Sequence, residues 1–335
     1  MSLSTTILAV DGGNSKTDIA LVTQDGAVLG TARVEAGSYH AVGMEKMVDN
    51  IRSGIGQAAA VAGSGADTTI PVVGVYCLAG ADLPVDDQRL QRALGEAKFA
   101  RETIVRNDAF AGLRAGCSNG WGISLVCGAG MNCAGVAPSG EIVRFPALGI
   151  LSGDEGGGGD LAIRALAAAI RAQDGRAPRS SLERLLPEHF GLHSPIDLLT
   201  AVHTDELAHS ALVDLAPVVF SAAQAGDEVA RGLVSWLADE LILMGGSAIR
   251  RLGLSDGEFE IVFVGSIWKT TDQVFHDRVC AGLREIGPQV VFRYLDAPPV
   301  LGAALLGADH LGLGATAQAR MRQELTAVCS QHLAS

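Results

Sequence analysis

The stretch Ala9–Val22, AVDGGNSKTDIALV, decides the fold that this sequence predicts. A buried strand delivers Asp11 into a tight glycine turn, and a second strand follows at once. Glycines let the backbone approach a ligand closely and turn its N–H groups toward it. Ser15 adds a hydroxyl and Lys16 a positive charge. The pattern is typical of a phosphate-binding turn, although an ordinary hairpin would fit this one stretch equally well.

A second glycine turn in the same setting favours the phosphate-binding interpretation. It lies in residues 125–136, LVCGAGMNCAGV, and a strand again follows it. Two such turns could hold a polyphosphate from both sides. The Walker A spacing GxxxxGK[ST] is absent, and the dinucleotide-binding fingerprint does not apply because a strand, not a helix, follows each turn.

Each glycine turn opens a similar series of predicted elements. Three strands come first, and helices and further strands alternate after them, which predicts mixed sheets covered by helices. In the first copy we expect helices over about 42–62 and 86–98, a strand over 102–107 and a helix from Asp108. In the second copy, helices dominate about 161–252, and a strand, a helix, a strand and a small-residue helix follow.

Composition limits the possible partners and locations. A chain of 335 residues with 48% hydrophobic and 19% charged residues predicts two domains with large cores. The net charge of −12 argues against nucleic acid and against an anionic membrane surface. The six cysteines form no CxxC pair and are expected to be buried free thiols, and the start of the chain does not read as a signal peptide. We expect a cytoplasmic protein.

The ordered motifs carry a family resemblance that covers nearly the whole chain. The set AVDGGNSKTD, VRNDAFAG, VCGAGMNCAG, GDEGGGG, FVGSIWKT and PVLGAALLG resembles the actin/hexokinase/Hsp70 ATPase superfamily. Within it, the set is most similar to the BadF/BadG/BcrA/BcrD ATPase family and to its N-acetylglucosamine kinases. The resemblance implies an α/β fold of two duplicated ribonuclease H-like (actin-like ATPase) domains, with mixed sheets flanked by helices and an active site in the interdomain cleft.

The same resemblance divides the chain into two domains. Residues 1–116 are expected to form the N-terminal actin-like ATPase domain, with a C-terminal helix at about 312–335 packing back on it. Residues 117–311 are expected to form the second domain, with a helical insertion at about 161–252. A homodimer is expected from the resemblance alone.

The resemblance also implies the cofactors, ATP and Mg²⁺. Asp11 would hold the metal, and Gly265 and Ser266 would lie near the adenosine. The remaining cofactor-binding residues would contact the phosphates; they are Gly12, Gly13, Asn14, Ser15, Lys16, Gly128, Ala129, Gly130, Met131 and Asn132. Ala129 and Met131 stand where the family usually has hydroxyl side chains, so their contacts to phosphate would come from the backbone only.

Asp108 is the expected general base. It follows the strand ETIVRN and precedes a helix, where its carboxylate could accept the proton of a sugar hydroxyl. From the residues alone, a helix N-cap is the favoured role for Asp108, since Asp is common at that position, and the resemblance reverses this preference; the two roles could coexist.

Sugar contacts are implied for two further segments and for Asp108 itself. The substrate-binding residues would be Ser38, His40, Asp108, Ala147, Leu148, Gly149 and Asp154. Ser38 replaces an Asn that is common in the family, and Ala147 and Leu148 replace the start of a Gly-Trp-Gly stretch. The glycines at 156–159 would make a pocket wall of bare backbone, while Glu155 would orient the loop or cap the helix.

These features predict an ATP-dependent kinase of an amino sugar, with N-acetylglucosamine and its 6-hydroxyl as the expected substrate and site. One alternative is a non-catalytic sugar or nucleotide sensor, suggested by the apolar residues in the second phosphate turn. Another is an ATPase activator of a 2-hydroxyacyl-CoA dehydratase, which needs cysteines for an iron–sulfur cluster. Cys127 and Cys133 are the only candidates for that role.

Overall fold

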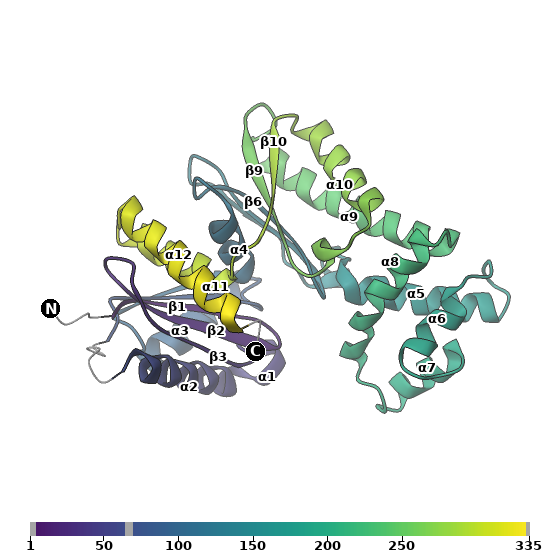
Figure 1. Ribbon diagram of the computed structural model, residues 1–335, viewed down its shortest axis with the longest axis horizontal. Helices are drawn as coiled ribbons and strands as arrows, with labels where there is room; N and C mark the ends of the chain where they lie inside the picture. Colours follow the sequence, from purple (N-terminus) through teal and green to yellow (C-terminus); the bar gives the residue numbers. More distant parts are fainter. Residues whose placement is uncertain (1–4, 64–69, 333–335) are drawn as a thin grey trace. The chain divides into compact units, whose positions relative to one another are not determined.

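The computed structural model describes residues 5–63 and 70–332 of the chain. Contacts divide the chain into two units (Figure 1). The first unit combines Met1–Ser124 with Arg293–Ser335, and the second is Leu125–Phe292. Each unit is built on its own five-stranded sheet.

The sheet of the first unit has the strand order β3–β2–β1–β4–β5. Its strands are β1 (Thr5–Gly12), β2 (Lys16–Thr23), β3 (Val28–Glu35), β4 (Val73–Leu78) and β5 (Glu102–Asn107). Strands β1, β2 and β3 are antiparallel, whereas β4 and β5 run parallel to β1. Since parallel strands end at the same edge, the residues that follow β1, β4 and β5 gather there.

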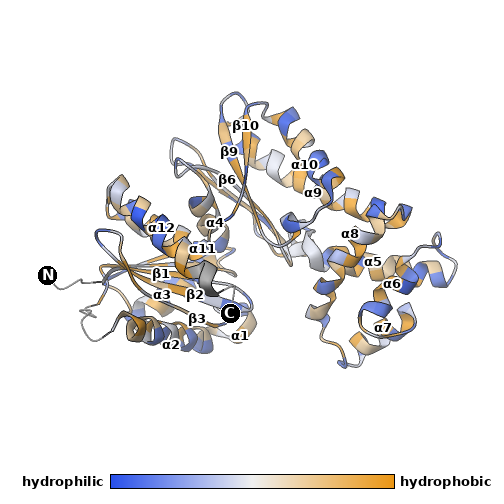
Figure 2. Ribbon diagram, in the orientation of Figure 1, coloured by the Kyte–Doolittle hydropathy of each residue, from blue (hydrophilic) through white to orange (hydrophobic). Residues whose placement is uncertain are grey.

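Both faces of this sheet are covered by helices, which explains why residues 7–10 of β1 are all apolar. Ile7 and Ala9 pack with α4 (Asp108–Gly116), α11 (Pro299–His310) and α12 (Ala315–His332). Leu8 and Val10 point to the other face and pack with α2 (Met44–Ala62) and α3 (Pro84–Ala97). Figure 2 shows the corresponding hydrophobic colouring along the strands and the two-sided colouring of α2 and α12.

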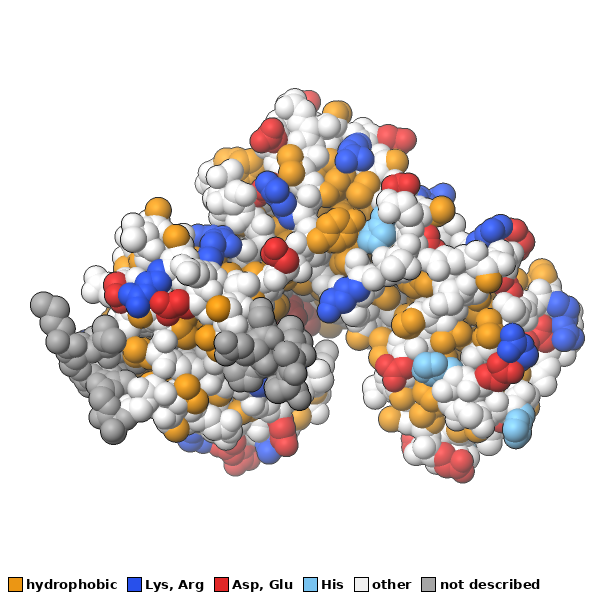
Figure 3. All heavy atoms as spheres, viewed as in Figure 1, with side chains coloured by type: hydrophobic (Ala, Val, Ile, Leu, Met, Phe, Trp, Pro, Cys, Tyr) orange, Lys and Arg blue, Asp and Glu red, His pale blue; other side chains and the backbone are white. Residues whose placement is uncertain are grey.

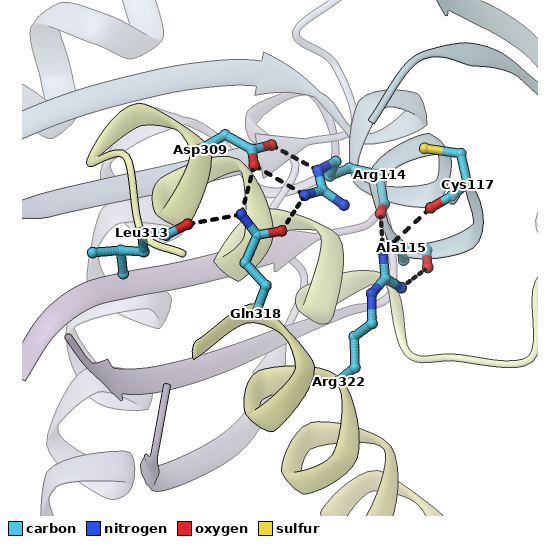
Figure 4. Close-up of polar contacts among 7 residues, drawn as sticks. All are labelled: Arg114, Ala115, Cys117, Asp309, Leu313, Gln318 and Arg322. Atoms are coloured by element: carbon cyan, nitrogen blue, oxygen red, sulfur yellow. Dashed lines mark hydrogen bonds and ion pairs between the residues drawn. The ribbon is translucent and has the colours of Figure 1, made fainter. Parts of the chain in front are cut away.

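A polar cluster joins the C-terminal helices to α4 (Figure 4). The Arg114 guanidinium makes a bidentate pair with Asp309, at 2.6 and 2.9 Å, and donates to Gln318 at 2.7 Å. Arg322 donates to the carbonyl oxygens of Arg114, Ala115 and Cys117, at 3.3, 2.6 and 3.2 Å. Arg322 thus supplies hydrogen bonds to carbonyl groups that the end of α4 leaves without helical partners.

The second sheet repeats the order of the first, as β8–β7–β6–β9–β10. Its strands are β6 (Gly122–Cys127), β7 (Met131–Val136), β8 (Ile142–Arg144), β9 (Phe259–Val264) and β10 (Val290–Tyr294). In both sheets the third, second, first, fourth and fifth strands lie side by side, so the predicted duplicated α/β fold is confirmed. The helices of this unit are α5 (Gly157–Gln173), α6 (Leu182–His189), α7 (Pro195–His203), α8 (Ala216–Gln224), α9 (Glu228–Arg251) and α10 (Gln273–Ile286).

The two units differ from the expected domains in where α11 belongs. The sequence-based division put residues 117–311 in one domain, whereas the structure packs α11 on β1 and α4 of the first unit. The physical reason is the small-residue face of α11. A Cβ on Gly302 would lie 1.8 Å from the Ala111 carbonyl oxygen, so only glycine permits this close approach to α4.

Helix α9 is the one described helix that is long and apolar enough to cross a membrane. Half of its most apolar window is buried within the fold, as in a core helix. It packs against α8 and α10.

Candidate active site

Asp11 and Asp108 lie at the carboxyl edge of the first sheet. Asp11 is in register with Asp18 on β2 and with Cys77 on β4, and Asp108 begins α4 directly after β5. Asp18 is buried and makes a bidentate pair with Arg33 of β3, at 2.6 and 2.9 Å. The edge therefore carries the carboxylates of Asp11 and Asp108, which form no ion pair with another described residue, next to the Asp18 carboxylate, which Arg33 neutralises.

Burial raises the pKa of both carboxylates, and neighbouring negative charge adds to the shift at Asp11. Burial, followed by the negative charges of Asp108 and Asp18, raises the pKa of Asp11 well above its usual range, although Lys16 and Arg33 oppose the shift. Burial also raises the pKa of Asp108 to about 6, and backbone N–H groups at the start of α4 offset part of this. A carboxylate with a pKa near 6 is still mostly ionised at neutral pH and is a stronger base than an exposed Asp.

The N-cap of α4 is Asn107, not Asp108. The Asn107 Oδ1 accepts from the Ala109 N–H at 3.0 Å, and its Nδ2 donates to Asp82 Oδ1 at 2.8 Å. The alternative reading of Asp108 as the cap is therefore wrong. One asparagine fixes the start of α4 and ties it to the loop after β4, which holds Asp108 in place.

The first glycine turn presents unpaired donors. It is closed by the Gly13 N–H to the Lys16 carbonyl at 2.8 Å and supported by the Gly37 N–H to the Gly13 carbonyl at 3.0 Å. Asn14 and Ser15 are exposed, and among the described residues their N–H groups have no hydrogen-bond acceptor. Lys16 is also exposed and forms no ion pair within the described part of the chain. Free amides beside an ammonium group favour an anion such as phosphate.

Ser38 and His40 lie together in the same unit, beside Gly80. A Cβ on Gly80 would lie 2.6 Å from the His40 ring and 3.3 Å from Ser38 Oγ. The hydroxyl of Ser38 is buried and has no hydrogen-bond partner among the described residues, whereas His40 is exposed. A buried hydroxyl without a partner carries a free-energy cost that a ligand hydroxyl could remove.

In the second unit, the four glycines at 156–159 pack on the second glycine turn. The N–H groups of Gly158 and Gly159 donate to the Gly128 and Ala129 carbonyls, both at 2.8 Å. A Cβ on Gly157 would lie 2.5 Å from the Gly130 carbonyl carbon. The glycines are thus needed because backbone packs on backbone, so they brace the turn in addition to any role as a pocket wall.

Gly265 packs on the same turn from a third segment. A Cβ there would lie 2.4 Å from the Cys127 carbonyl oxygen, and its φ of +113° already favours glycine. Two segments, the glycines at 156–159 and Gly265, therefore hold this turn. Ala129 and Gly130 are exposed, and their N–H groups have no acceptor in the described chain.

The side chains of two residues in this turn, Met131 and Asn132, are buried. The Met131 side chain packs against Gly156, since a Cβ on Gly156 would lie 2.8 Å from the Met131 sulfur. Asn132 is also largely buried, and its Oδ1 accepts from the Cys133 N–H at 2.7 Å. Both side chains therefore pack inside the second unit, and any contact of these two residues to phosphate would come from the backbone.

Asp154 organises the loop before α5. Its Oδ2 accepts from the Ala147 N–H at 2.8 Å and from the Ser152 hydroxyl at 2.6 Å, and its own N–H donates to the Gly149 carbonyl at 3.0 Å. Its Oδ1 has no partner among the described residues. Glu155 instead pairs with Arg164 at 2.8 Å, so it orients the start of α5.

A cavity of about 530 Å³ opens beside Ser266 in the second unit. Its lining includes Phe220 and Ser221 of α8, together with Lys269 and Thr271. Trp268 does not line it; the indole is buried, stacks on Phe263 and donates to the Leu125 carbonyl at 3.2 Å. The cavity has mostly apolar walls with a few polar groups, which suits a nucleoside.

The sequence interpretation missed Asp82, Asn107 and most of the cavity lining. Asn107 was detectable, because Asn is among the residues most favoured at an N-cap. Neither the hydrogen bond between Asn107 and Asp82 nor the presence of Phe220 and Thr271 in one cavity leaves a signal in local sequence, since each brings together residues far apart in the chain.

The sheet order, the paired glycine turns and the carboxylates at the strand edge define a protein of the actin-like ATPase fold, the fold of many sugar kinases. The family model for the BadF/BadG/BcrA/BcrD ATPase family matches residues 8–307. The chain belongs to that family.

Curated relatives and solved structures agree with this assignment. An N-acetylmuramic acid/N-acetylglucosamine kinase of Clostridium acetobutylicum is 25% identical, over 81% of this chain and 88% of its own length. An N-acetyl-D-glucosamine kinase of Dictyostelium discoideum is 26% identical, over 89% and 96%. A Chromobacterium violaceum structure, provisionally named an N-acetylglucosamine kinase, has a TM-score of 0.71 at 23% identity, covering 90% of this chain and 98% of its own. These similarities support the expected ATP-dependent carbohydrate kinase.

The structure does not favour an iron–sulfur activator. Cys127 and Cys133 are fully buried, and burial raises the pKa of both thiols. On the face that Figure 3 shows, acidic and basic side chains of the described residues are interspersed.

Proposed function

We propose that this protein phosphorylates N-acetylglucosamine at its 6-hydroxyl group, with ATP as donor and Asp108 as general base. The observation that carries the proposal is the Asp108 carboxylate, whose pKa is raised to about 6 by burial while Asn107 takes the capping role. Because Asn107 is the N-cap, the Asp108 carboxylate is not required for capping and can accept a proton. The names of the two curated relatives support the choice of an amino sugar.

In the proposed reaction, the 6-hydroxyl oxygen attacks the γ-phosphorus while its proton passes to Asp108. The bond from the γ-phosphorus to the bridging oxygen breaks, and ADP leaves with the electron pair. Asp154 Oδ1 and the Ser38 hydroxyl, which lack partners among the described residues, would bind sugar hydroxyls. His40, Ala147, Leu148 and Gly149 complete the proposed sugar contacts.

The phosphates of ATP are assigned to the free amides of the two glycine turns. In one turn these belong to Asn14 and Ser15, with Lys16 adding charge; in the other, they belong to Ala129 and Gly130. We assign the adenosine to the cavity beside Ser266. A hydrogen bond to a charged group contributes about 1.5–3 kcal/mol, so backbone donors can hold a phosphate without hydroxyl side chains.

Asp11 is the proposed contact for Mg²⁺. Its carboxylate lies near those of Asp108 and Asp18, and this excess negative charge is what a cation relieves. No cage of three protein ligands exists in the described chain, which fits an ion that takes most of its oxygens from phosphates and water. When bound, Mg²⁺ would neutralise charge on the phosphate oxygens.

The proposal also includes a cytoplasmic location and a homodimer for this protein.

Coupled measurement of ADP release over a panel of hexoses and amino sugars tests this function. We expect Mg²⁺-dependent turnover with N-acetylglucosamine, loss of turnover in Asp108→Asn, and a product whose 6-position carries the phosphate by NMR. Sugar binding without turnover in the wild-type protein would instead support a sensor, the function favoured by the apolar Ala129 and Met131 side chains.

A further inference from the structure

Tyr39 lies between two of the proposed sugar contacts, Ser38 and His40, and is half-buried against the core of the first unit. Its hydroxyl donates to Oδ1 of Asp86, a buried carboxylate on α3. The other oxygen of that carboxylate, Oδ2, accepts from the Leu83 N–H at 2.8 Å. Asp86 thus joins Tyr39 to the start of α3.

The segment that carries Tyr39 is the short helix α1 (Tyr39–Val42), of which Ser38 is the N-cap. The rings of Tyr39 and His40 lie against each other, with their centroids 3.9 Å apart. Both proposed sugar contacts also pack on Gly80, where a Cβ would lie 2.6 Å from the His40 ring. The segment is therefore fixed to the chain after β4 at two points, by packing at Gly80 and by the hydrogen bond at Asp86.

The same stretch after β4 reaches the start of α4. Asp82 directly precedes Leu83, and its Oδ1 accepts from the Asn107 Nδ2 at 2.8 Å. Asn107 is in turn the N-cap that precedes Asp108. Hydrogen bonds within the first unit thus connect Tyr39 with the backbone that carries the proposed general base.

The Tyr39 hydroxyl is suited to remain a donor to Asp86. Burial, and then the hydrogen bond to Asp86, raises the pKa of Tyr39, although a hydrogen bond from Arg89 opposes the shift. The phenol therefore stays protonated at neutral pH. A hydrogen bond to a charged acceptor is stronger than one between neutral groups, so its loss should be felt in the segment that it holds.

We infer that Tyr39 is a positioning residue for sugar binding: through Asp86, it holds Ser38 and His40 in place relative to Asp108. This inference rests on the proposed kinase function. The Tyr39 hydroxyl acts through Asp86, to which it donates, and is not assigned a contact to the sugar. Displacing a binding group by about 1 Å can lower the rate of an enzyme by about 100-fold.

Tyr39→Phe keeps the ring and removes only the hydroxyl. It should lower kcat/KM for N-acetylglucosamine by about 10- to 100-fold, chiefly through KM, and leave the KM for ATP unchanged. Calorimetry without ATP should show a matching loss of affinity for the sugar. Hydrogen exchange should become faster at the N–H groups of Ala41, Val42 and Gly43, which donate to the Ser38 and Tyr39 carbonyls.

Tyr76→Phe is the matched control. Tyr76 lies on β4 of the same unit and is fully buried, and its hydroxyl has no hydrogen-bond partner among the described residues. Removing this hydroxyl should leave the sugar affinity, both KM values and the exchange rates unchanged. The melting temperature checks that each variant is folded.

Asp86→Asn tests whether Tyr39 acts through Asp86. One side-chain oxygen then remains, so it can accept from the Tyr39 hydroxyl or from the Leu83 N–H, but not from both. The substitution should weaken sugar binding in the otherwise wild-type chain and add little to the loss in Tyr39→Phe. Independent, additive losses would overturn the inference.

The outcomes separate this inference from the proposed function. Turnover of N-acetylglucosamine with wild-type KM and affinity in Tyr39→Phe overturns the inference and leaves the kinase standing. Equal losses for sugar and ATP, or the same losses in Tyr76→Phe, also overturn it, because they indicate a general disturbance of the fold. Sugar binding without turnover in the wild-type protein, if weakened in Tyr39→Phe but not in Tyr76→Phe, supports the inference and overturns the kinase.

Discussion

A Cβ on Gly157 would lie 2.5 Å from the carbonyl carbon of Gly130, closer than any side chain can approach a backbone. Gly157→Ala should therefore displace the start of α5 from the second glycine turn. We expect the free energy of unfolding to fall by about 1–3 kcal/mol beyond the cost of placing alanine at a φ of +82°. We also expect the variant to lose ATP binding. Urea unfolding and nucleotide titration measure the two effects.

The control for this substitution is Gly175→Ala. Gly175 has nearly the same φ, +81°, but nothing lies within 4 Å of its Cβ position. Its free energy of unfolding should fall only by the cost of placing alanine in a left-handed conformation, about 1–2 kcal/mol, and ATP binding should remain. Equal losses in the two variants would show that the close approach to Gly130 is unimportant.

Asp108→Asn should lower kcat by about 10²–10⁴-fold and at the same time stabilise the protein at neutral pH. The folded-state pKa of about 6 lies above the unfolded value of about 3.9, so ionising Asp108 destabilises the fold. That cost is absent below about pH 4, grows through the window to pH 6 and is complete above it. At pH 8 the free energy of unfolding of Asp108→Asn should exceed that of the wild type by about 1–3 kcal/mol, and urea unfolding as a function of pH measures it.

Asp25→Asn provides a control of opposite sign. A hydrogen bond from the Thr23 hydroxyl, then the charge of Arg320, lowers the pKa of Asp25. Its ionised form therefore stabilises the fold above the unfolded pKa, and the variant should lose stability at neutral pH but not in acid. A stability gain in both variants would contradict the assignment of burial as the cause at Asp108.

Arg322→Ala should destabilise the first unit by about 2–4 kcal/mol, because three carbonyl oxygens at the end of α4 lose a charged donor. Arg320→Ala on the same helix is the control. Arg320 pairs with Asp25 and Glu324 at an exposed position, where an ion pair contributes about 0–1 kcal/mol. Thermal melts of both variants test this, and similar shifts would argue against a capping role for Arg322.

Ser221→Trp should fill part of the cavity beside Ser266 and raise the KM for ATP by at least tenfold, while the KM for sugar changes little. Thr204→Trp places the same side chain at an exposed position after α7, outside the cavity, and should leave both constants unchanged. Initial-rate kinetics with each substrate varied in turn measures the KM for ATP and the KM for sugar in both variants. An unchanged KM for ATP in Ser221→Trp would exclude this cavity as the nucleoside site.

The sequence predicted the sheets well because local patterns determine them. Ile7–Val10 is apolar on both faces, and the glycine turns fix where β1 and β6 end. Asp108 was correctly placed after β5 for the same reason. The unit to which α11 belongs was not predictable, since its alanines and glycines would suit the face of either sheet.

Side-chain partnerships were the least predictable part of the site. Asn107 and Asp108 are adjacent and both suit an N-cap, so backbone geometry alone decides between them. The glycines at 156–159 indicated close approach, but the surface approached is the turn at 128–131, which no local pattern identifies. Long-range contacts such as Arg322 with Cys117 likewise depend on the completed fold.

The return of α11 and α12 to the first unit has a consequence for how the chain folds during synthesis. The second unit is one continuous segment, Leu125–Phe292, and leaves the ribosome whole. The first sheet emerges earlier, yet one of its apolar faces is covered only by α4 until Val300, Leu305 and Met321 have been translated. The unit that begins first is therefore completed last, and its exposed face is where a nascent chain of this protein would most need a chaperone.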